Sequence, residues 1–221
     1  MNWRTLPLLI LTLLLGLLVW QAWRVWLHRW RLRRLAQFEC PSWMLQSLRQ
    51  TYPQLRPQDL KQVQDGLRQF LRICLQARGR QVAMPSQVVD ALWHALILDT
   101  RRYQHLCRQV FGRVLHHTPA QAMSTRDHRN EPLRRAWRLA CRDEGLNPQN
   151  ALHLPLLFAL DTTLAIPGGF RYVPDCGAKG SQDSHCGNSL GCSSSACSGS
   201  DSGCSSDGGG DGGGCGGGGG D

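Results

Sequence analysis

The chain has 221 residues, which is enough for one membrane-spanning helix, one domain of ordinary size and a tail, and excludes two large domains. Its net charge of +9 is spread unevenly. Residues 1–35 hold six Arg and no acid, and residues 36–172 hold 18 Lys and Arg against 10 Asp and Glu. Residues 173–221 hold one Lys against six Asp, so a basic body is followed by an acidic tail.

The N-terminal segment has the length and composition of a single membrane-spanning helix. Its 19 residues from Thr5 to Trp23 include no charged residue and would rise about 28 Å as a helix, close to the thickness of the hydrocarbon core of a bilayer. Tryptophans flank this segment at both ends, as interfacial aromatic belts do. A cleaved secretory signal is the alternative, but only Arg4 precedes the apolar stretch and no small-x-small cleavage site follows it. We therefore predict an uncleaved anchor.

The charges on the two flanks predict the orientation of this anchor. A single arginine, Arg4, precedes it, and five follow it: Arg24, Arg29, Arg31, Arg33 and Arg34. The positive-inside rule then leaves the N-terminus outside and places everything after residue 24 in the cytoplasm. We expect a single-pass protein of the cell (inner) membrane that contacts the lipid bilayer through residues 5–34.

The remaining sequence predicts an all-α fold, a small helical bundle with a disordered tail. Apolar residues recur at three- and four-residue steps between helix starts at Pro or Ser and stops at Gly. The helices that we expect are residues 58–77, 86–111, 131–144 and 154–166. The domain boundaries that follow are 1–40 for the anchor and basic juxtamembrane segment, 41–176 for the helical domain and 177–221 for the tail.

A polar cluster marks the predicted helix 86–111. At 100° per residue, Asp90, His94, Arg101 and His105 fall within an arc of about 60°, between two apolar faces, so we expect this helix to be largely enclosed. Asp90 and His94 are one turn apart and can pair. Shortly after the helix, His116 and His117 add two more imidazoles on a turn. We expect His94 to be buried and hydrogen-bonded to Asp90 or to this turn.

Several landmarks in this region carry a resemblance to a known family. They are Met84-Pro-Ser-Gln-Val-Val-Asp90-Ala-Leu-Trp93-His94, then Ile97-Leu-Asp-Thr-Arg-Arg-Tyr103, Cys107, Phe111-Gly112, His116-His117-Thr-Pro119, Leu154-Pro-Leu-Leu-Phe-Ala-Leu-Asp161 and Tyr172-Val-Pro-Asp-Cys176. This order of residues resembles the glycine-rich-domain-containing-protein-like family over about two-thirds of the chain. Some relatives have a second His two positions after the Trp-His pair, where this chain has Leu96, which weakens a metal site that relies on His-x-His. The resemblance implies a Gly-rich segment but no catalytic reaction.

Three interpretations of the cluster remain open at this stage. The first is a structural pair of Asp90 and His94. The second is a metal site that uses His94 and one or both of His116 and His117, with Cys107 or His105 as a further ligand and zinc as the default ion. The third is hydrolytic catalysis, for which no nucleophile stands out: Cys107 lies about 20 Å along the helix from His94. We therefore name no catalytic residue, expect no confident cofactor, and lean against an enzyme.

The tail and a basic helix face complete the sequence-based expectations. The tail cysteines are unevenly spaced in low-complexity sequence and should stay reduced in the cytoplasm, with loose metal capture or intermolecular disulfides as alternatives: Cys176, Cys186, Cys192, Cys197, Cys204 and Cys215. The arginines of helix 131–144 lack an aromatic binding motif, so we expect no nucleic-acid partner: Arg134, Arg135, Arg138 and Arg142. The sequence therefore predicts a membrane-anchored helical interaction or scaffold module with an unknown protein partner, and indicates no oligomeric state. A metal-binding protein or a hydrolase-type enzyme is the alternative.

Overall fold

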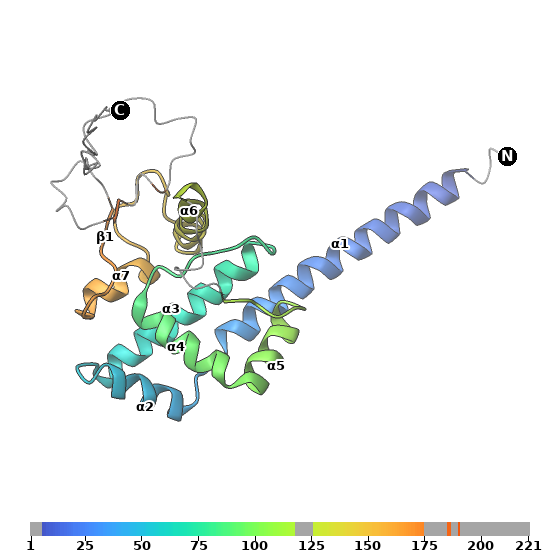
Figure 1. The fold of residues 1–221 in the computed structure, drawn as a ribbon. Coiled ribbons are helices and arrows are strands. Elements are labelled where there is room, and N and C mark those ends of the chain that lie inside the picture. The colour runs from blue at the N-terminus through green and yellow to red at the C-terminus, as the bar shows by residue number, and fades with distance from the viewer. Residues whose placement is uncertain (1–5, 118–125, 175–184, 187–189, 191–221) are drawn as a thin grey trace, which may run out of the picture. The chain divides into compact units, whose positions relative to one another are not determined.

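Helices account for nearly all the regular structure of the chain, as the sequence predicts (Figure 1). The computed structural model describes residues 6–117, 126–174, 185–186 and 190. They form α1 Leu6–Ala36, α2 Ser42–Thr51, α3 Pro57–Gln76, α4 Gln87–Leu98, α5 Thr100–Val110, α6 Arg126–Asp143 and α7 Leu156–Thr163. Two short strands, β1 Tyr172–Val173 and β2 His185–Cys186, pair in parallel with Tyr172 opposite His185. The tail that the sequence predicts to be disordered lies outside the described residues, except for residues 185–186 and 190.

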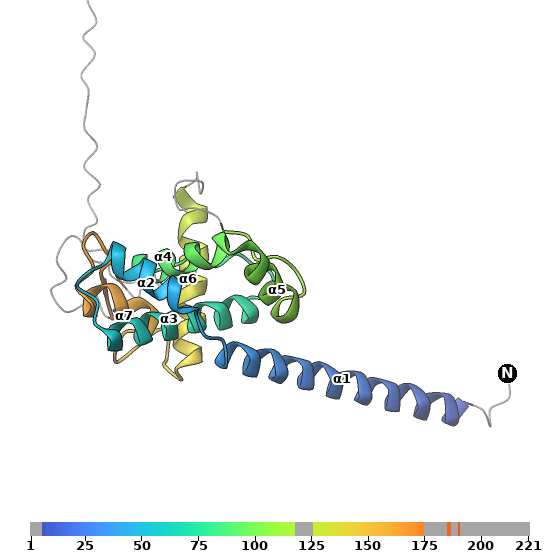
Figure 2. The ribbon, with the colours of Figure 1, turned by 90° about the horizontal axis from the view of Figure 1, so that it is seen from below.

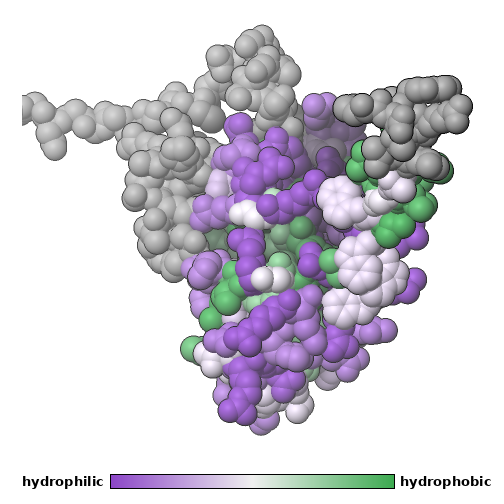
Figure 3. Space-filling model, turned by 90° about the vertical axis from the view of Figure 1, so that its right-hand side faces the viewer, coloured by the Kyte–Doolittle hydropathy of each residue, from purple (hydrophilic) through white to green (hydrophobic). Residues whose placement is uncertain are grey.

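The apolar and basic parts of the N-terminal segment form one continuous helix. At 1.5 Å per residue the 31 residues of α1 span about 46 Å, which exceeds the roughly 30 Å hydrocarbon core of a bilayer. The large apolar side chains from Ile10 to Trp30, apart from the half-buried Leu27, are exposed, and Figures 1 and 2 show this part of α1 projecting from the other helices. Figure 3 shows the hydrophobic surface of α1 beside the mainly hydrophilic surface of the domain. By length and composition α1 could cross a membrane, a test that a signal sequence also passes.

The C-terminal end of α1 packs against the other helices. Leu35 is fully buried, and α1 packs there against α3 and α5. The Arg34 Nε donates to Gln109 Oε1 over 3.3 Å. Just beyond the helix, the Arg68 Nε donates to the Phe38 carbonyl oxygen over 2.7 Å. Packed side chains and hydrogen bonds, as well as the backbone, therefore join α1 to the other helices.

Helix α3 lies at the centre of the bundle, where it contacts α1, α4, α6 and α7. Pro57 starts it, and Asp59 in the first turn accepts from the Arg56 backbone N–H over 2.8 Å. Its long buried stripe explains why the sequence pattern predicted it well. At Gly66 the backbone comes so close to α7 that a Cβ there would clash with the Leu160 side chain.

The prediction of a single helix over residues 86–111 is wrong. The chain forms two helices instead, with α4 ending at Leu98 and α5 beginning at Thr100. Asp99 lies between them with ψ 69°, and its Oδ1 accepts from the Arg102 backbone N–H over 3.2 Å. Aspartate favours such local capping over a helix interior because its carboxylate competes for backbone N–H groups. The expected enclosure of this segment is also wrong at its end, since Leu98 is 81% exposed.

A buried carboxylate fixes the start of α4. Asp161 of α7 accepts from Ser86 Oγ and the Gln87 N–H, each over 2.7 Å, and from the Val88 N–H over 3.3 Å. It also accepts from the Phe170 N–H over 2.9 Å. Ser86 in turn accepts from the third N–H of the helix, at Val89. The first backbone donors of α4 are thus all paired, as a buried helix N-terminus requires.

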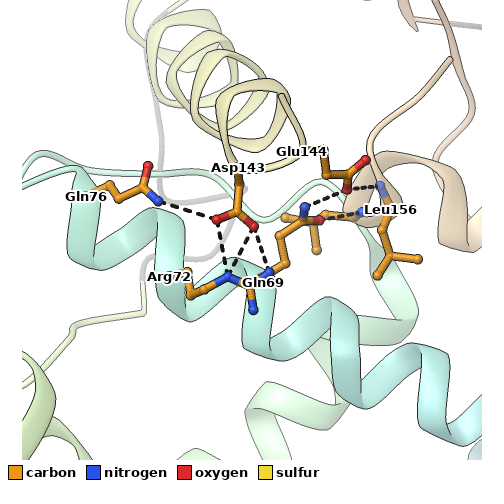
Figure 4. Close-up of polar contacts among 7 residues, drawn as sticks. Gln69, Arg72, Gln76, Asp143, Glu144 and Leu156 are labelled. Atoms are coloured by element: carbon orange, nitrogen blue, oxygen red, sulfur yellow. Dashed lines mark hydrogen bonds and ion pairs between the residues drawn. The ribbon is translucent and has the colours of Figure 1, made fainter. Parts of the chain in front are cut away.

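A second polar network holds α6 across α3 and the start of α7 (Figure 4). Arg72 makes a two-pronged ion pair with Asp143, with the shortest N···O distance 2.7 Å. Gln69 donates to Glu144 over 2.6 Å, and Glu144 accepts from the Leu156 N–H over 2.7 Å. Gln69 Oε1 accepts from the Leu157 N–H. Gln69 and Glu144 therefore cap the start of α7, where the N-cap residue supplies no capping side chain.

Candidate metal centre

Two separate segments bring a carboxylate and two imidazoles together. Asp90 and His94 lie one turn apart on α4, and His117 comes from the segment that follows α5. The His117 Nε2 is 3.2 Å from Asp90 Oδ1, and the His94 Nδ1 is 3.3 Å from Asp90 Oδ2. One ligand atom from each residue fits within a set whose members all lie within 4.8 Å of one another. Within the described part of the chain, this is the one His/Cys/Asp/Glu group with that geometry.

Aromatic rings support His117 from the protein side. Its ring lies edge-on to that of Trp93, with centroids 4.7 Å apart, and Trp93 packs on Phe70 at the same separation. The ring centroids of His94 and His117 are 4.3 Å apart. Since Phe70 is fully buried and Trp93 nearly so, the cluster rests on the hydrophobic core and faces solvent on its other side.

We expected His94 to be buried and hydrogen-bonded; the hydrogen bond is present, but the side chain is not buried. The His94 Nδ1 lies 2.8 Å from the Asp90 backbone oxygen, so the residue is hydrogen-bonded as expected. Its side chain is 49% exposed, however, while those of Asp90 and His117 are 32% and 17% exposed. The expected burial depended on one continuous helix, and α4 instead ends at Leu98, one turn beyond His94.

The other predicted members lie elsewhere. His116 is exposed and lies outside the three-residue group, although it is next to His117 in the chain. Arg101 and His105 are exposed on α5, so the arc expected for a single helix does not exist. Cys107 is fully buried in the core. The polar cluster thus reduces to Asp90, His94 and His117, and Asp90 replaces His116 in the predicted metal set.

The three remaining side chains fit a zinc ion by donor type and spacing. Zinc takes imidazole nitrogen at about 2.0–2.1 Å and carboxylate oxygen at about 2.0–2.2 Å, which places tetrahedral ligand atoms about 3.3 Å apart. Ligand atoms that lie within 4.8 Å need side-chain shifts on the order of 1.5 Å to reach that spacing. The His94 Nδ1 lies 2.8 Å from the Asp90 carbonyl oxygen, and metal-ligating histidines are typically oriented by a hydrogen bond of one ring nitrogen.

The cysteines of the described domain are unsuited to such a site. Cys40, Cys74, Cys107 and Cys141 are all free and buried. Burial raises the pKa of the Cys40 and Cys141 thiols to about 12, and it also raises the pKa of the Cys74 and Cys107 thiols. Because the thiolate is the form that binds metal or attacks a substrate, these four side chains are inert core residues.

One neighbouring feature was missed in the sequence. Arg80 and Arg113 line a cavity that His117 and Trp93 also border. Arg113 follows the helix stop at Gly112, and Arg80 follows Gly79, so in the sequence each resembles an ordinary surface residue beside a turn. No pattern of spacing links them, and only the tertiary fold brings them to one opening.

Comparison with known proteins identifies a family for the chain. No curated protein and no solved structure matches it. The UCP032817-like family matches residues 30–190, a stretch that begins in the last turns of α1 and includes Asp90, His94 and His117. This match covers well over half of the sequence. The chain therefore belongs to the UCP032817-like family.

Proposed function

We propose that this protein is a membrane-anchored helical module that binds one divalent metal ion, zinc by preference, through Asp90, His94 and His117. The observation that carries the proposal is that three potential ligand atoms lie within 4.8 Å of one another, although His117 is 27 positions from Asp90 in the chain. The partial exposure of the three side chains gives an ion a path from solvent.

The proposed site has three protein ligands and leaves a fourth position open. In zinc proteins an open position holds water, a substrate or a further side chain. A side chain supplied by a partner protein would make the metal part of an interaction surface, which accords with the interaction or scaffold role expected from the sequence. A hydrolase-type reaction through zinc-bound water is the alternative, and we assign no residue to it.

The membrane location is part of the same proposal. The apolar stretch of α1, its exposed side chains and the arginines that follow it support an anchor with the domain on the cytoplasmic side. We also retain kinship to the glycine-rich-domain-containing-protein-like family as a proposal that rests on the motifs around Asp90 and His94.

Metal binding to single-residue variants tests the proposal. The purified chain in detergent would be stripped with chelator, loaded with zinc, desalted and measured for zinc by mass spectrometry. A parallel chain that ends at Gly191 removes four tail cysteines that could bind zinc themselves: Cys192, Cys197, Cys204 and Cys215. We expect one zinc per shortened chain, lost in Asp90→Asn, His94→Ala and His117→Ala.

Two histidines outside the three-residue group serve as matched controls. His105→Ala and His116→Ala each remove an exposed imidazole and should keep the zinc. If the parent chain holds no zinc after loading and desalting, the proposal is refuted. It is also refuted if the variants of His94 and His117 bind as much zinc as the parent chain.

A further inference from the structure

A cavity of about 210 Å³ opens beside the candidate metal centre. Its walls come from the C-terminal half of α3, the connection from Gly79 to Met84, Trp93 of α4, and the segment from Arg113 to His117. His117 borders both this cavity and the metal centre, whereas Asp90 and His94 do not line it.

The cavity combines an aromatic floor with basic groups. Phe70 and Trp93, whose ring centroids lie 4.7 Å apart, form part of its buried wall, with Met84, Val82 and Leu115 as further apolar neighbours. The polar side chains of the lining are Gln81 and four residues with basic side chains: Arg80, Arg113, His116 and His117. No carboxylate belongs to the lining residues. A ligand that matches both parts carries an apolar body and a negative charge.

Backbone geometry holds one of the arginines in place. Gly79 has φ +93°, a conformation that L side chains rarely adopt, and a Cβ there would meet Arg113 Nη2 at 3.3 Å. The Arg113 guanidinium therefore lies directly against the backbone at Gly79. Its charge also opposes the rise that burial causes in the pKa of Cys74, a thiol that lines the same cavity. Arg113 is thus close to the interior of the cavity although it is exposed at the surface.

The volume limits the size of the ligand. A cavity of about 150 Å³ accommodates benzene, and sites for drug-sized ligands measure about 300–1,000 Å³. A cavity of about 210 Å³ holds one ring or one branched aliphatic group together with a carboxylate. We infer that this cavity binds a small organic monocarboxylate, with the apolar group against the half-buried Val82, Met84 and Leu115, over the buried rings of Phe70 and Trp93, and the carboxylate at Arg113 and Arg80. This inference is independent of metal binding.

Benzoate is a suitable probe for a ligand of this class. Ligand-observed NMR would follow its titration against the full chain in nanodiscs of zwitterionic lipid. We expect saturable binding of benzoate and binding at least about tenfold weaker for benzamide, its neutral analogue of nearly the same shape, as is typical when a charge-assisted contact is lost. Inorganic phosphate, which lacks an apolar body, should bind at least about tenfold more weakly than benzoate.

Variants locate the site and separate it from the metal. Arg113→Gln and Arg80→Gln change exposed residues, should fold normally, and should each weaken benzoate binding about tenfold or more. Arg108→Gln, an exposed arginine of α5 outside the lining, should leave it unchanged, and so should His94→Ala. No saturable binding, or affinity unaffected by both Arg113→Gln and Arg80→Gln, would overturn the assignment. Loss of binding in His94→Ala would also overturn it, because the anion would then be bound at the metal centre.

Discussion

Replacement of Asp161 by Ala should destabilise the domain more than any loss of a surface ion pair. Asp161 is 3% exposed, and its two oxygens accept four hydrogen bonds. Alanine would leave the Ser86 hydroxyl and the N–H groups of Gln87, Val88 and Phe170 without this acceptor. Each buried donor that loses its partner costs about 1–3 kcal/mol, and water that enters the space recovers part of the sum. We expect a loss on the order of 3–5 kcal/mol in the free energy of unfolding.

The geometry also predicts an intermediate effect for asparagine. Oδ1 accepts from Ser86 and Val88, whereas Oδ2 accepts from Gln87 and Phe170. An asparagine amide has one acceptor oxygen, so it can serve only one of these two pairs and leaves the other facing an N–H₂ group. Asp161→Asn should therefore cost about half as much as Asp161→Ala.

Urea unfolding of the purified chain, followed by near-UV circular dichroism, measures these differences. Asp99→Ala is the matched control, because Asp99 also caps a helix through its carboxylate but its side chain is 25% exposed. It should cost about 1 kcal/mol, the usual loss for a helix N-cap. If Asp161→Ala costs no more than Asp99→Ala, the reasoning about the buried carboxylate is refuted.

Three further predictions follow from the fold. Gly66→Ala should destabilise by about 1–2 kcal/mol in the same unfolding assay, since overpacking against Leu160 outweighs the gain in helix propensity, and an unchanged or higher stability would contradict this. The four core cysteines should resist iodoacetamide at pH 8 until the chain is unfolded, because burial raises the pKa of their thiols. Peptide mass spectrometry measures the labelling, and rapid labelling of Cys40 or Cys141 in the folded chain would contradict this. A reporter fused after residue 40 should behave as cytoplasmic, and activity of an exterior-specific reporter there would reverse the proposed topology.

The boundary of the tail affects how its removal should be tested. The compact unit runs to Gly191, and Leu190 is buried against the core, whereas the tail expected from composition begins at residue 177. Deletion of residues 192–221 is therefore the suitable truncation, and thermal unfolding should be nearly unchanged by it. A large drop in melting temperature would show that the deleted residues stabilise the domain.

Local sequence signals determined much of the helical architecture. The apolar run of α1, the stripe of α3 and the stops at glycine each act within a few residues, so they can be interpreted without knowledge of the fold. The pairing of Asp90 with His94 is of the same kind, because a spacing of four places both side chains on one face of any helix. Asp99 also carries a local signal, but the apolar periodicity on either side of it favoured an unbroken helix.

Tertiary structure alone decided the rest. Whether His116 or His117 joins Asp90 depends on how the chain leaves α5, and adjacent residues in an irregular segment point in different directions. Asp161 reaches the start of α4 from a residue 75 positions away from Ser86, and Arg113 and Arg80 meet at one cavity from separate turns. Such convergence depends on the packing of whole helices against α3, which no local pattern encodes. For this chain, periodicity and capping specify where helices form, and only the packing of those helices brings the proposed metal ligands and the lining of the cavity together.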